Sequence, residues 1–473
     1  MAGAREQFGS KLGFILAAAG SAVGIGNLVG FPVGAAKNGG GAFLLMYSIF
    51  VIFICLPVML AEMSVGRHTQ RDPLGAYSNL SNKHKAWRFA GWLSVMTPFM
   101  IAVFYSVITV WIFGYLVGSL SGNLAHLADP SYFGTFINSN SVFIYMAIVL
   151  GILYYILQGG VKEGIEKGAK ILMPALFIML LGLVVFVLFQ DNALAGVQFY
   201  LVPDVSKIDS GVINGALSQA FFSLSLGMGI LLTYASYIDR KSDIPGSAKL
   251  IALTDTAVAF TAGLMILPAI FSFNPSINPD ELSESSVGLI FTFLPKIFLA
   301  LQTSLGYVGA SAVASIFFLL VFFAAITSLV SIFEVPVSAI MSEKKVSRRK
   351  ALATGGILLV ILSVLCTLSF GRVNFFTHFV EYGGAIKSFF DVIIDVFYET
   401  ILPLNGLLIC LFVSYRWKQH NFNQALEQGA PTYKHSLFEK YVSLSVGTFI
   451  PLILAFILLN TVLTKYFNMP LIG

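Results

Sequence analysis

Charge is scarce in this sequence. Only 11% of its 473 residues are Asp, Glu, Lys or Arg, against about 25% in a typical soluble domain, while 57% are hydrophobic. A soluble protein with 43 phenylalanines and a mean hydropathy of +0.85 would expose more apolar surface to water than one core can bury. The same side chains can face lipid. The composition excludes a soluble fold, and a net charge of +5 is too small to indicate a nucleic-acid partner.

Cysteine, histidine and nucleotide-binding motifs are also scarce. The three cysteines, Cys55, Cys366 and Cys410, lie in separate hydrophobic runs, so their spacing predicts neither a disulfide framework nor a metal site. The six histidines lie mostly in loops and share no run with a Cys and Glu cluster, which argues against a membrane-embedded enzyme. A Gly-rich loop ending in Gly-Lys-Ser or Gly-Lys-Thr is missing as well, so nothing indicates that a nucleotide supplies energy.

Long apolar runs fill most of the chain instead. Crossing about 30 Å of hydrocarbon takes about 20 helical residues, and about eleven runs reach that length. The connecting segments are short, so we predict that residues 1–473 form one domain of an all-α integral membrane protein. The first run carries Asn27 and several glycines, and we expect it to belong to the mature protein rather than to a signal peptide. The runs cover about 11–36, 41–66, 88–120, 142–158, 164–190, 211–237, 247–273, 303–341, 350–371, 388–415 and 440–465.

Lysine and arginine are unevenly distributed among the connecting segments. Cytoplasmic loops retain positive charge, and a cytoplasmic N-terminus places 22 of the 28 basic residues on that side. We therefore predict a multi-pass protein of the plasma (inner) membrane with its N-terminus in the cytoplasm. The basic residues left outside are Lys37, Lys207, Lys296, Arg372, Lys387 and Lys465.

Two of the runs are poor helices at their centres. The first contains three glycines between Gly20 and Asn27, and the sixth contains two between Ser223 and Gly229. Each interior glycine costs about 1 kcal/mol relative to alanine, which favours a break in mid-membrane, although close helix packing through small residues is the alternative. The two runs are five apart, as in the inverted five-plus-five repeat of a secondary transporter. The repeats would cover about 11–190 and 211–415, with an extra helix at about 440–465.

Short motifs occur in order along these runs. They are Gly24-x-Gly26-Asn27, Phe31-Pro32, Asn38 to Phe43, Glu62 with Gly66-Arg67, Gly164-Ile165-Glu166 with Lys170, Met173-Pro174, Ser225-Leu226-Gly227-x-Gly229, Thr233 to Tyr237, and Thr327-Ser328. In this order and spacing they resemble the neurotransmitter:sodium symporter family, above all its bacterial amino-acid transporters. The resemblance implies a sodium-coupled symporter of amino acids that works by alternating access and is not an enzyme.

The resemblance also implies two sodium sites built from oxygen ligands, which suit a hard cation. Hydroxyls bonded back to their own helix are the alternative reading of the serine and threonine ligands. The first site would comprise the Ala22 carbonyl, the side chains of Asn27, Ser223 and Asp255, and the substrate carboxylate. The second would comprise the carbonyls of Gly20, Val23 and Ala324 with the hydroxyls of Thr327 and Ser328.

The amino-acid site would lie between the two breaks. By resemblance, backbone N–H groups from Gly24 to Gly26 and the Tyr105 hydroxyl would hold the substrate carboxylate, and the carbonyls of Phe222 and Ser225 would accept from its ammonium group. No side chain of this pocket is charged, so we expect a neutral substrate side chain, and the flexible Met228 favours large hydrophobic or aromatic substrates. The pocket would further include Ser21, Ala22, Ile25, Ile101, Ser223, Phe291, Ser328 and Ile332. For Phe222 and Phe291 the alternative is ordinary packing.

The expected gates depart from the family pattern. The resemblance assigns Asp395 to the outer gate, yet Gly30 stands where relatives have its arginine partner and Val29 where they have a large residue. We therefore expect Asp395 to lack a partner across the outer vestibule. Asp391 and Glu399 lie four residues to either side, and helical spacing puts all three acids on one face.

The inner end departs from the pattern too. Arg5 stands at the position of the inner-gate arginine, but Ser342 occupies the position of its aspartate partner, with Glu343 beside it as a substitute. Two further acids, Glu62 and Glu334, lie inside the hydrophobic runs, where ionisable groups are rare and functional. We expect Glu62 to hydrogen-bond the unwound part of the sixth run, whereas the sequence assigns no role to Glu334.

Asp255 indicates whether transport should depend on chloride. Chloride-dependent relatives have Asn at this position and add a chloride ion nearby, and Ala259 stands where chloride-independent relatives can have Glu. The resemblance thus implies chloride-independent transport, unless Asp255 merely caps or salt-bridges near the cytoplasmic end of its helix. The other function class left open is a receptor or channel of the same fold that binds without cycling. The expected partners are an amino acid, sodium ions and the lipid bilayer, with no nucleic acid, and the chain would be a monomer or loose dimer.

Overall fold

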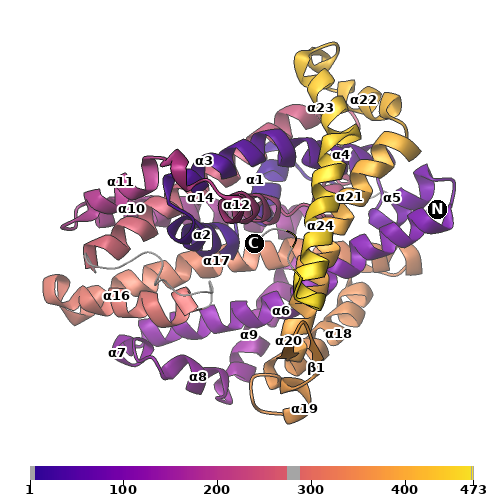
Figure 1. Cartoon of the computed structure of the whole chain (residues 1–473). Helices are drawn as coiled ribbons and strands as arrows, with labels where there is room; N and C mark the ends of the chain where they lie inside the picture. The colour runs from indigo at the N-terminus through magenta and orange to yellow at the C-terminus, as the bar shows by residue number, and fades with distance from the viewer. Residues whose placement is uncertain (1–5, 274–287, 470, 472–473) are drawn as a thin grey trace.

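The computed structural model describes residues 6–273, 288–469 and 471, and this part of the chain is almost entirely helical (Figure 1). Nine of its helices are long and apolar enough to cross a membrane, and a bent pair adds a tenth candidate span. The nine are Gly41–Thr69 (α3, η2 and α4), Lys85–Leu120 (α6), Ser141–Gln158 (α9), Val161–Leu188 (η3 and α10), Ile244–Ser272 (within α14), Gln302–Lys344 (α17), Arg348–Leu368 (α18), Phe389–Arg416 (α20, η7, α21 and η8) and Leu437–Phe467 (α23 and α24).

The first predicted span is the bent pair. Helix α1 (Lys11–Ala22) ends at Val23, whose extended backbone (φ −72°, ψ 96°) leaves the helix. The chain resumes as η1 (Gly26–Gly30) and α2 (Phe31–Lys37), and the two segments are bent by 52°. The glycines at this point therefore mark a break, as the sequence predicts.

The sixth predicted span is broken more completely. Helices α12 (Ser210–Ser223) and α13 (Ile230–Ala235) are separated by a stretch of turns, and each is too short to cross a membrane alone. This division is why the structure has fewer candidate spans than the sequence has apolar runs. Within the stretch, Gly227 and Gly229 have φ angles of 77° and 65°, which only glycine adopts without strain.

The peptide groups freed by this break are held by side chains. The Gly227 N–H donates to Glu62 Oε1 at 2.7 Å, as the sequence predicts, and Asn405 Nδ2 on α21 (Leu402–Leu411) donates to the Gly227 carbonyl at 2.9 Å. An unsatisfied peptide group inside a membrane costs several kcal/mol. A break in a spanning helix is therefore tolerated only where its freed peptide groups find hydrogen-bond partners. Glu62 and Asn405 therefore fix the shape of the unwound segment.

Helices α6 and α17 lie against each other at the centre of the bundle. Their membrane-spanning windows are 83% buried, against 28% for α9, so α9 lies at the periphery. Helix α24 (Phe449–Phe467), yellow in Figure 1, runs along α21 and ends beside strand β1 (Val380–Tyr382). This arrangement brings the end of α24 close to the segment that precedes the tenth run.

The connecting segments contain short elements. Strand β1 pairs with β2 (Ala385–Lys387) through Gly383 and Gly384, both at positive φ, in a hairpin that an all-α reading of the sequence missed. The short helices are α5 (Pro73–Leu80), α7 (Leu124–Leu127), α8 (Tyr132–Ile137), α11 (Ala193–Leu201), η4 (Val205–Lys207), η6 (Leu289–Phe293), α16 (Leu294–Ala300), α19 (Asn374–Thr377), α22 (Gln419–Glu427) and η9 (Pro431–Tyr433).

Candidate functional site

The breaks of the first and sixth spans lie against each other. Ser225 Oγ donates to the Ser21 carbonyl at 3.2 Å, and Gln219 Nε2 on α12 donates to the Gly26 carbonyl at 2.9 Å. The Phe222 ring packs so closely over Gly26 that a methyl group added there would lie 2.9 Å from it. The two breaks therefore build one site, with backbone from both spans exposed to it.

A buried carboxylate organises one side of this site. Asp255 on α14 (Ile244–Phe273) is completely buried. Asn27 Nδ2 donates to its Oδ1 at 2.7 Å, and the Ser223 hydroxyl lies 3.0 and 2.9 Å from its two oxygens. The Tyr47 hydroxyl on α3 (Gly41–Phe50) donates to Oδ2 at 3.0 Å. The structure thus brings together the three side chains expected at the first sodium site.

The charge of Asp255 is not balanced by a basic residue. Within the described ranges no lysine, arginine or histidine forms a salt bridge with it, so the proposed alternative of a salt bridge finds no partner there. A buried carboxylate surrounded by neutral donors is costly unless a cation joins it. Tyr47 is the member that the sequence did not reveal, because one tyrosine in an aromatic-rich run carries no signal.

A second set of oxygens lies between α1 and α17. The Ser328 hydroxyl is 3.4 Å from both the Gly20 and Val23 carbonyls, at the point where span one unwinds. Thr327 Oγ1 donates to the Ala324 carbonyl of its own helix at 3.0 Å. The expected ligands of the second sodium site are thus neighbours, with Thr327 bonded back to its helix and Ser328 turned toward span one.

Tyr105 on α6 closes the site opposite the first break. Its hydroxyl accepts from the Ile25 N–H at 3.3 Å. A methyl group on Gly24 would lie 2.9 Å from this hydroxyl and 2.7 Å from Ser328 Oγ, so only glycine leaves room there. The Gly24 N–H donates to Asn27 Oδ1 at 3.2 Å, which couples the loop to the side chain that contacts Asp255.

Several apolar residues that are expected in the pocket are buried in the structure. Ala22 and Met228 at the breaks, Ile101 on α6 and Ile332 on α17 are buried. The Phe222 ring meets Tyr398 of η7 (Ile394–Ile401) edge to face, with ring centroids 4.6 Å apart. Tyr398 joins this contact from the tenth run, and the sequence did not single it out.

Phe291 is placed differently from the other predicted pocket residues. The ring contacts described for Phe291 are with Trp111, Tyr115 and Phe133, at centroid distances of 6.0, 4.9 and 4.9 Å. The Tyr115 hydroxyl also donates to the Phe291 carbonyl at 2.9 Å. These contacts match the packing alternative rather than a position between the breaks.

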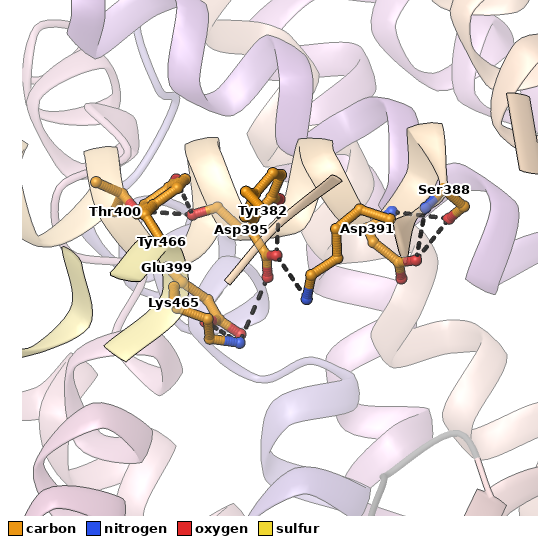
Figure 2. Close-up of polar contacts among 9 residues, drawn as sticks. Tyr382, Ser388, Asp391, Asp395, Glu399, Thr400, Lys465 and Tyr466 are labelled. Carbon is orange, nitrogen blue, oxygen red and sulfur yellow. Dashed lines mark hydrogen bonds and ion pairs between the residues drawn. The ribbon is translucent and has the colours of Figure 1, made fainter. Parts of the chain in front are cut away.

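Asp395 on η7 has several polar partners, although none of those in the described part of the chain comes from the first span across the vestibule (Figure 2). The Tyr382 hydroxyl donates to Asp395 Oδ2 at 2.8 Å, and Lys387 and Lys465 lie 3.2 and 3.4 Å from its carboxylate. Lys465 also pairs with Glu399 at 2.6 Å. The two lysines belong to β2 and α24 instead of the first span. Lys465 is 70 residues from Asp395 in the sequence, so no local pattern predicts that pair.

Two residues near Asp395, namely Asp391 and Tyr382, have different structural roles. Asp391 forms a capping box with Ser388 at the start of α20 (Phe389–Ile393), where its Oδ2 accepts from the Ser388 hydroxyl at 2.7 Å. Burial and the adjacent Asp395 carboxylate raise the pKa of Tyr382, which keeps that hydroxyl protonated as a donor. Asp391 is therefore a local helix cap, and Asp395 is the acid that joins the hairpin to the last helix.

The inner end is held by Arg348 at the start of α18. Its guanidinium makes two 2.8 Å hydrogen bonds to Glu334, which is completely buried, and two of 3.0 and 3.1 Å to Glu6. The Tyr237 hydroxyl donates to Glu334 Oε1 at 2.7 Å. Glu334, to which the sequence assigns no role, is thus the buried anchor of a network that reaches the N-terminal segment.

The residues expected at the inner gate lie elsewhere or outside the described range. Arg5 falls outside the described residues. Ser342 Oγ donates to the carbonyl of Ser338 on its own helix, and Glu343 is exposed to solvent. Phe8 packs its ring edge to face with Phe14 and Tyr234, at 5.5 and 5.6 Å. The charged groups of the described inner network are therefore Arg348 with its two partners Glu334 and Glu6.

Comparisons with known proteins agree with this arrangement. The model of the Sodium:neurotransmitter symporter family matches residues 5–133 and 133–470. An uncharacterized sodium-dependent transporter, YhdH of Bacillus subtilis (strain 168), is 34% identical over 462 residues, covering 96% of this chain and 97% of that protein. An uncharacterized sodium-dependent transporter of Haemophilus influenzae is 30% identical, with 96% of this chain and 98% of that protein covered.

One solved structure matches nearly the whole chain. The crystal structure of MhsT in complex with L-phenylalanine superposes with a TM-score of 0.81 and 36% sequence identity. The match covers 96% of this chain and 99% of that one. The fold described above is therefore shared with a solved structure over nearly its whole length.

Proposed function

The chain belongs to the sodium:neurotransmitter symporter family, and from this premise we propose that it carries large, neutral, hydrophobic amino acids together with sodium, by alternating access and without chloride. The family consists of sodium-dependent transporters rather than enzymes. One observation supports the proposal most: two broken helices face each other around the buried Asp255 carboxylate, which has only neutral donors. Such a site offers backbone groups to a zwitterion and a carboxylate to a cation.

The donor set fits sodium as the co-transported ion at two positions. In the first, the Asp255 carboxylate, the Ser223 hydroxyl and the Asn27 amide supply hard oxygen ligands, together with the Ala22 carbonyl. In the second, the Ser328 hydroxyl already lies beside two backbone carbonyls of span one. A substrate carboxylate beside the first position would share the ion, which would make binding of substrate and sodium mutually dependent.

The residues proposed for the walls of the site support this substrate class. Ile101, Phe222, Met228 and Ile332 are apolar, and no residue proposed for the pocket carries a charge. A charged substrate side chain would therefore be buried without a partner, at a cost of several kcal/mol. The phenylalanine bound to MhsT, the transporter of similar structure, supports an apolar substrate here.

We expect leucine, phenylalanine and tryptophan to compete for uptake far better than glutamate or lysine. Purified protein in proteoliposomes with an inward sodium gradient would accumulate the labelled hydrophobic amino acid, and each competitor would be added at equal concentration. The expected difference is at least a hundredfold, since burying an unpaired charge costs several kcal/mol and each 1.4 kcal/mol is tenfold. Stronger competition by glutamate or lysine would refute the substrate class, and binding without accumulation would indicate a receptor instead of a transporter.

The outer gate is proposed to depart from the arginine-based pattern. Asp395 is held by Lys387 and Lys465, while the position of the arginine in relatives is Gly30. We infer that these lysines keep the gate acid neutralised on its own side, and that closure over the substrate depends on the edge-to-face contact of Phe222 with Tyr398.

Removing both lysine partners of Asp395 should impair transport more than removing either one. Asp395 is only 4% exposed, so the variant Lys387→Met/Lys465→Met leaves a nearly buried carboxylate without a cation. We expect a fall in uptake rate of tenfold or more for the double variant, a smaller fall for each single variant, and none for Lys296→Met, which removes an exposed lysine. Equal rates in the double variant and in Lys296→Met would show that Asp395 needs neither lysine.

The remaining features of the proposal concern placement in the membrane. We propose a plasma-membrane location with a cytoplasmic N-terminus, since this orientation keeps most basic residues inside. We further propose that the whole chain acts as one transporter domain with an inverted repeat of about 11–190 and 211–415 and an extra helix at about 440–465, as a monomer or loose dimer.

A further inference from the structure

An apolar groove runs between α9 and α18 on the periphery of the bundle. It encloses about 580 Å³, and every side chain that lines it is hydrophobic, from Phe143 at one end of α9 to Leu157 at the other. At about 1.5 Å per residue this wall is about 21 Å long, which exceeds the half-thickness of about 15 Å that one leaflet of acyl chains occupies. An extended hydrocarbon chain would therefore fit along it.

The buried side of the groove is formed by large residues such as Leu153 and Leu352, and small residues lie nearer its opening. Ala147 on α9 and Ala353 and Gly356 on α18 line it, and a methyl group added to Gly356 would meet nothing within 4 Å. The groove therefore has open space beside Gly356. It opens toward lipid, since only 28% of the membrane-spanning window of α9 is buried.

Arg372 lies at the Phe143 end of the groove with most of its donors unused. Its guanidinium carbon is 5.0 Å from the centroid of the Phe143 ring, and Nη1 makes a single long hydrogen bond of 3.4 Å to Asn140 Oδ1. The Nε and Nη2 atoms are shielded from solvent and have no hydrogen-bond partner in the described parts of the chain. Buried donors of this kind are normally satisfied, so an acceptor from outside the chain is indicated.

The N-terminus of α9 is at the same place. The helix begins at Ser141, next to Asn140, and its start has no side-chain cap, although the N–H groups of Val142 and Phe143 donate to backbone carbonyls. The N-terminal end of a helix dipole favours an anion, as does an arginine with free donors. The apolar groove therefore has a positively charged end, and its other lining residues carry no charge.

We propose that this groove binds an anionic glycerophospholipid, with one acyl chain along α9 and α18 and the phosphate at Arg372 and the start of α9. The guanidinium fork suits bidentate contact with phosphate oxygens. A net negative headgroup is favoured over phosphatidylcholine, because the choline cation would face both Arg372 and the positive end of the helix. The site is separate from the transport site between the breaks.

Lipid titration of the purified full-length protein tests this proposal. The protein is delipidated in detergent, phosphatidylglycerol or phosphatidylcholine is added, and bound lipid is counted by native mass spectrometry. We expect at least fivefold tighter binding of phosphatidylglycerol. Arg372→Gln should lower its affinity at least tenfold and remove the preference, whereas Lys296→Gln, which removes another basic residue, should not.

A second variant tests the acyl-chain part of the site. Gly356→Phe fills the groove without an initial clash, and it should weaken binding of both lipids at least fivefold. Gly182→Phe on α10 is the matched control, because its position is also open but lies outside the groove. Unchanged phosphatidylglycerol binding in Arg372→Gln or Gly356→Phe would overturn the proposal. Equally strong binding of soluble glycerol phosphate would also overturn it, since that result would indicate an anion site without a lipid.

Discussion

Asp255→Asn should lower sodium affinity at least tenfold in chloride-free medium and should make transport respond to chloride. The carboxylate is buried among neutral donors, so its full charge is available to a bound cation. At about 4 Å and an effective dielectric constant near 20, such an attraction is about 4 kcal/mol, or more than a hundredfold in affinity. Uptake is measured against sodium concentration with chloride or gluconate as the anion.

The native protein and a control variant that loses a different carboxylate are measured in the same way. Asp191→Asn removes an exposed carboxylate from a connecting segment and should behave like the native protein in both media. Native transport that disappears when gluconate replaces chloride would contradict the assignment of Asp255 as the fixed charge. Unaltered sodium affinity in Asp255→Asn would show that the carboxylate has another function.

Arg348→Met should destabilise the protein strongly and abolish most transport. The substitution leaves Glu334, which is 0% exposed, without the cation that makes two hydrogen bonds to it. Removing one partner of a buried ion pair costs about 3–5 kcal/mol, because the other charge stays buried and unpaired. The thermal unfolding midpoint of the purified protein and its sodium-driven uptake report the two effects.

The neighbouring arginine and a double substitution distinguish loss of the ion pair from loss of a basic residue. Arg349→Met changes an exposed arginine one position away and should keep the unfolding midpoint of the native protein. Arg348→Met/Glu334→Gln removes both charges and should regain much of the stability lost in the single variant. An Arg348→Met protein as stable as Arg349→Met would mean that Glu334 needs no cation.

The features that were visible in the sequence are those with local causes. Low charge and long apolar runs indicate membrane spans because each helix must satisfy its own backbone in lipid. The glycine clusters around Gly24 and Gly227 indicate breaks because interior glycines weaken a helix locally. A polar partner for Glu62 was expected because an acid inside a membrane run needs one, although the break that it contacts lies 165 residues further along the chain.

The features that the sequence did not reveal depend on contacts between distant segments. Asp395 and Lys465 are 70 residues apart, and no local pattern connects them. Tyr47 reaches Asp255 across 208 residues of chain, and as one aromatic residue in an apolar run it looks like packing. Phe291 shows the opposite case, because a position taken from resemblance lies within a cluster of aromatic rings in the structure.

The dependence of substrate affinity on sodium concentration tests the central claim most directly. Binding of a labelled hydrophobic amino acid to the purified protein is measured from sodium-free medium to saturating sodium, with potassium keeping the ionic strength constant. If the substrate carboxylate and Asp255 share an ion, affinity must rise steeply with sodium, and by reciprocity the substrate must raise sodium affinity by the same factor. We expect an increase of at least tenfold. Substrate affinity that stays constant across the sodium range would contradict sodium-coupled symport by this site.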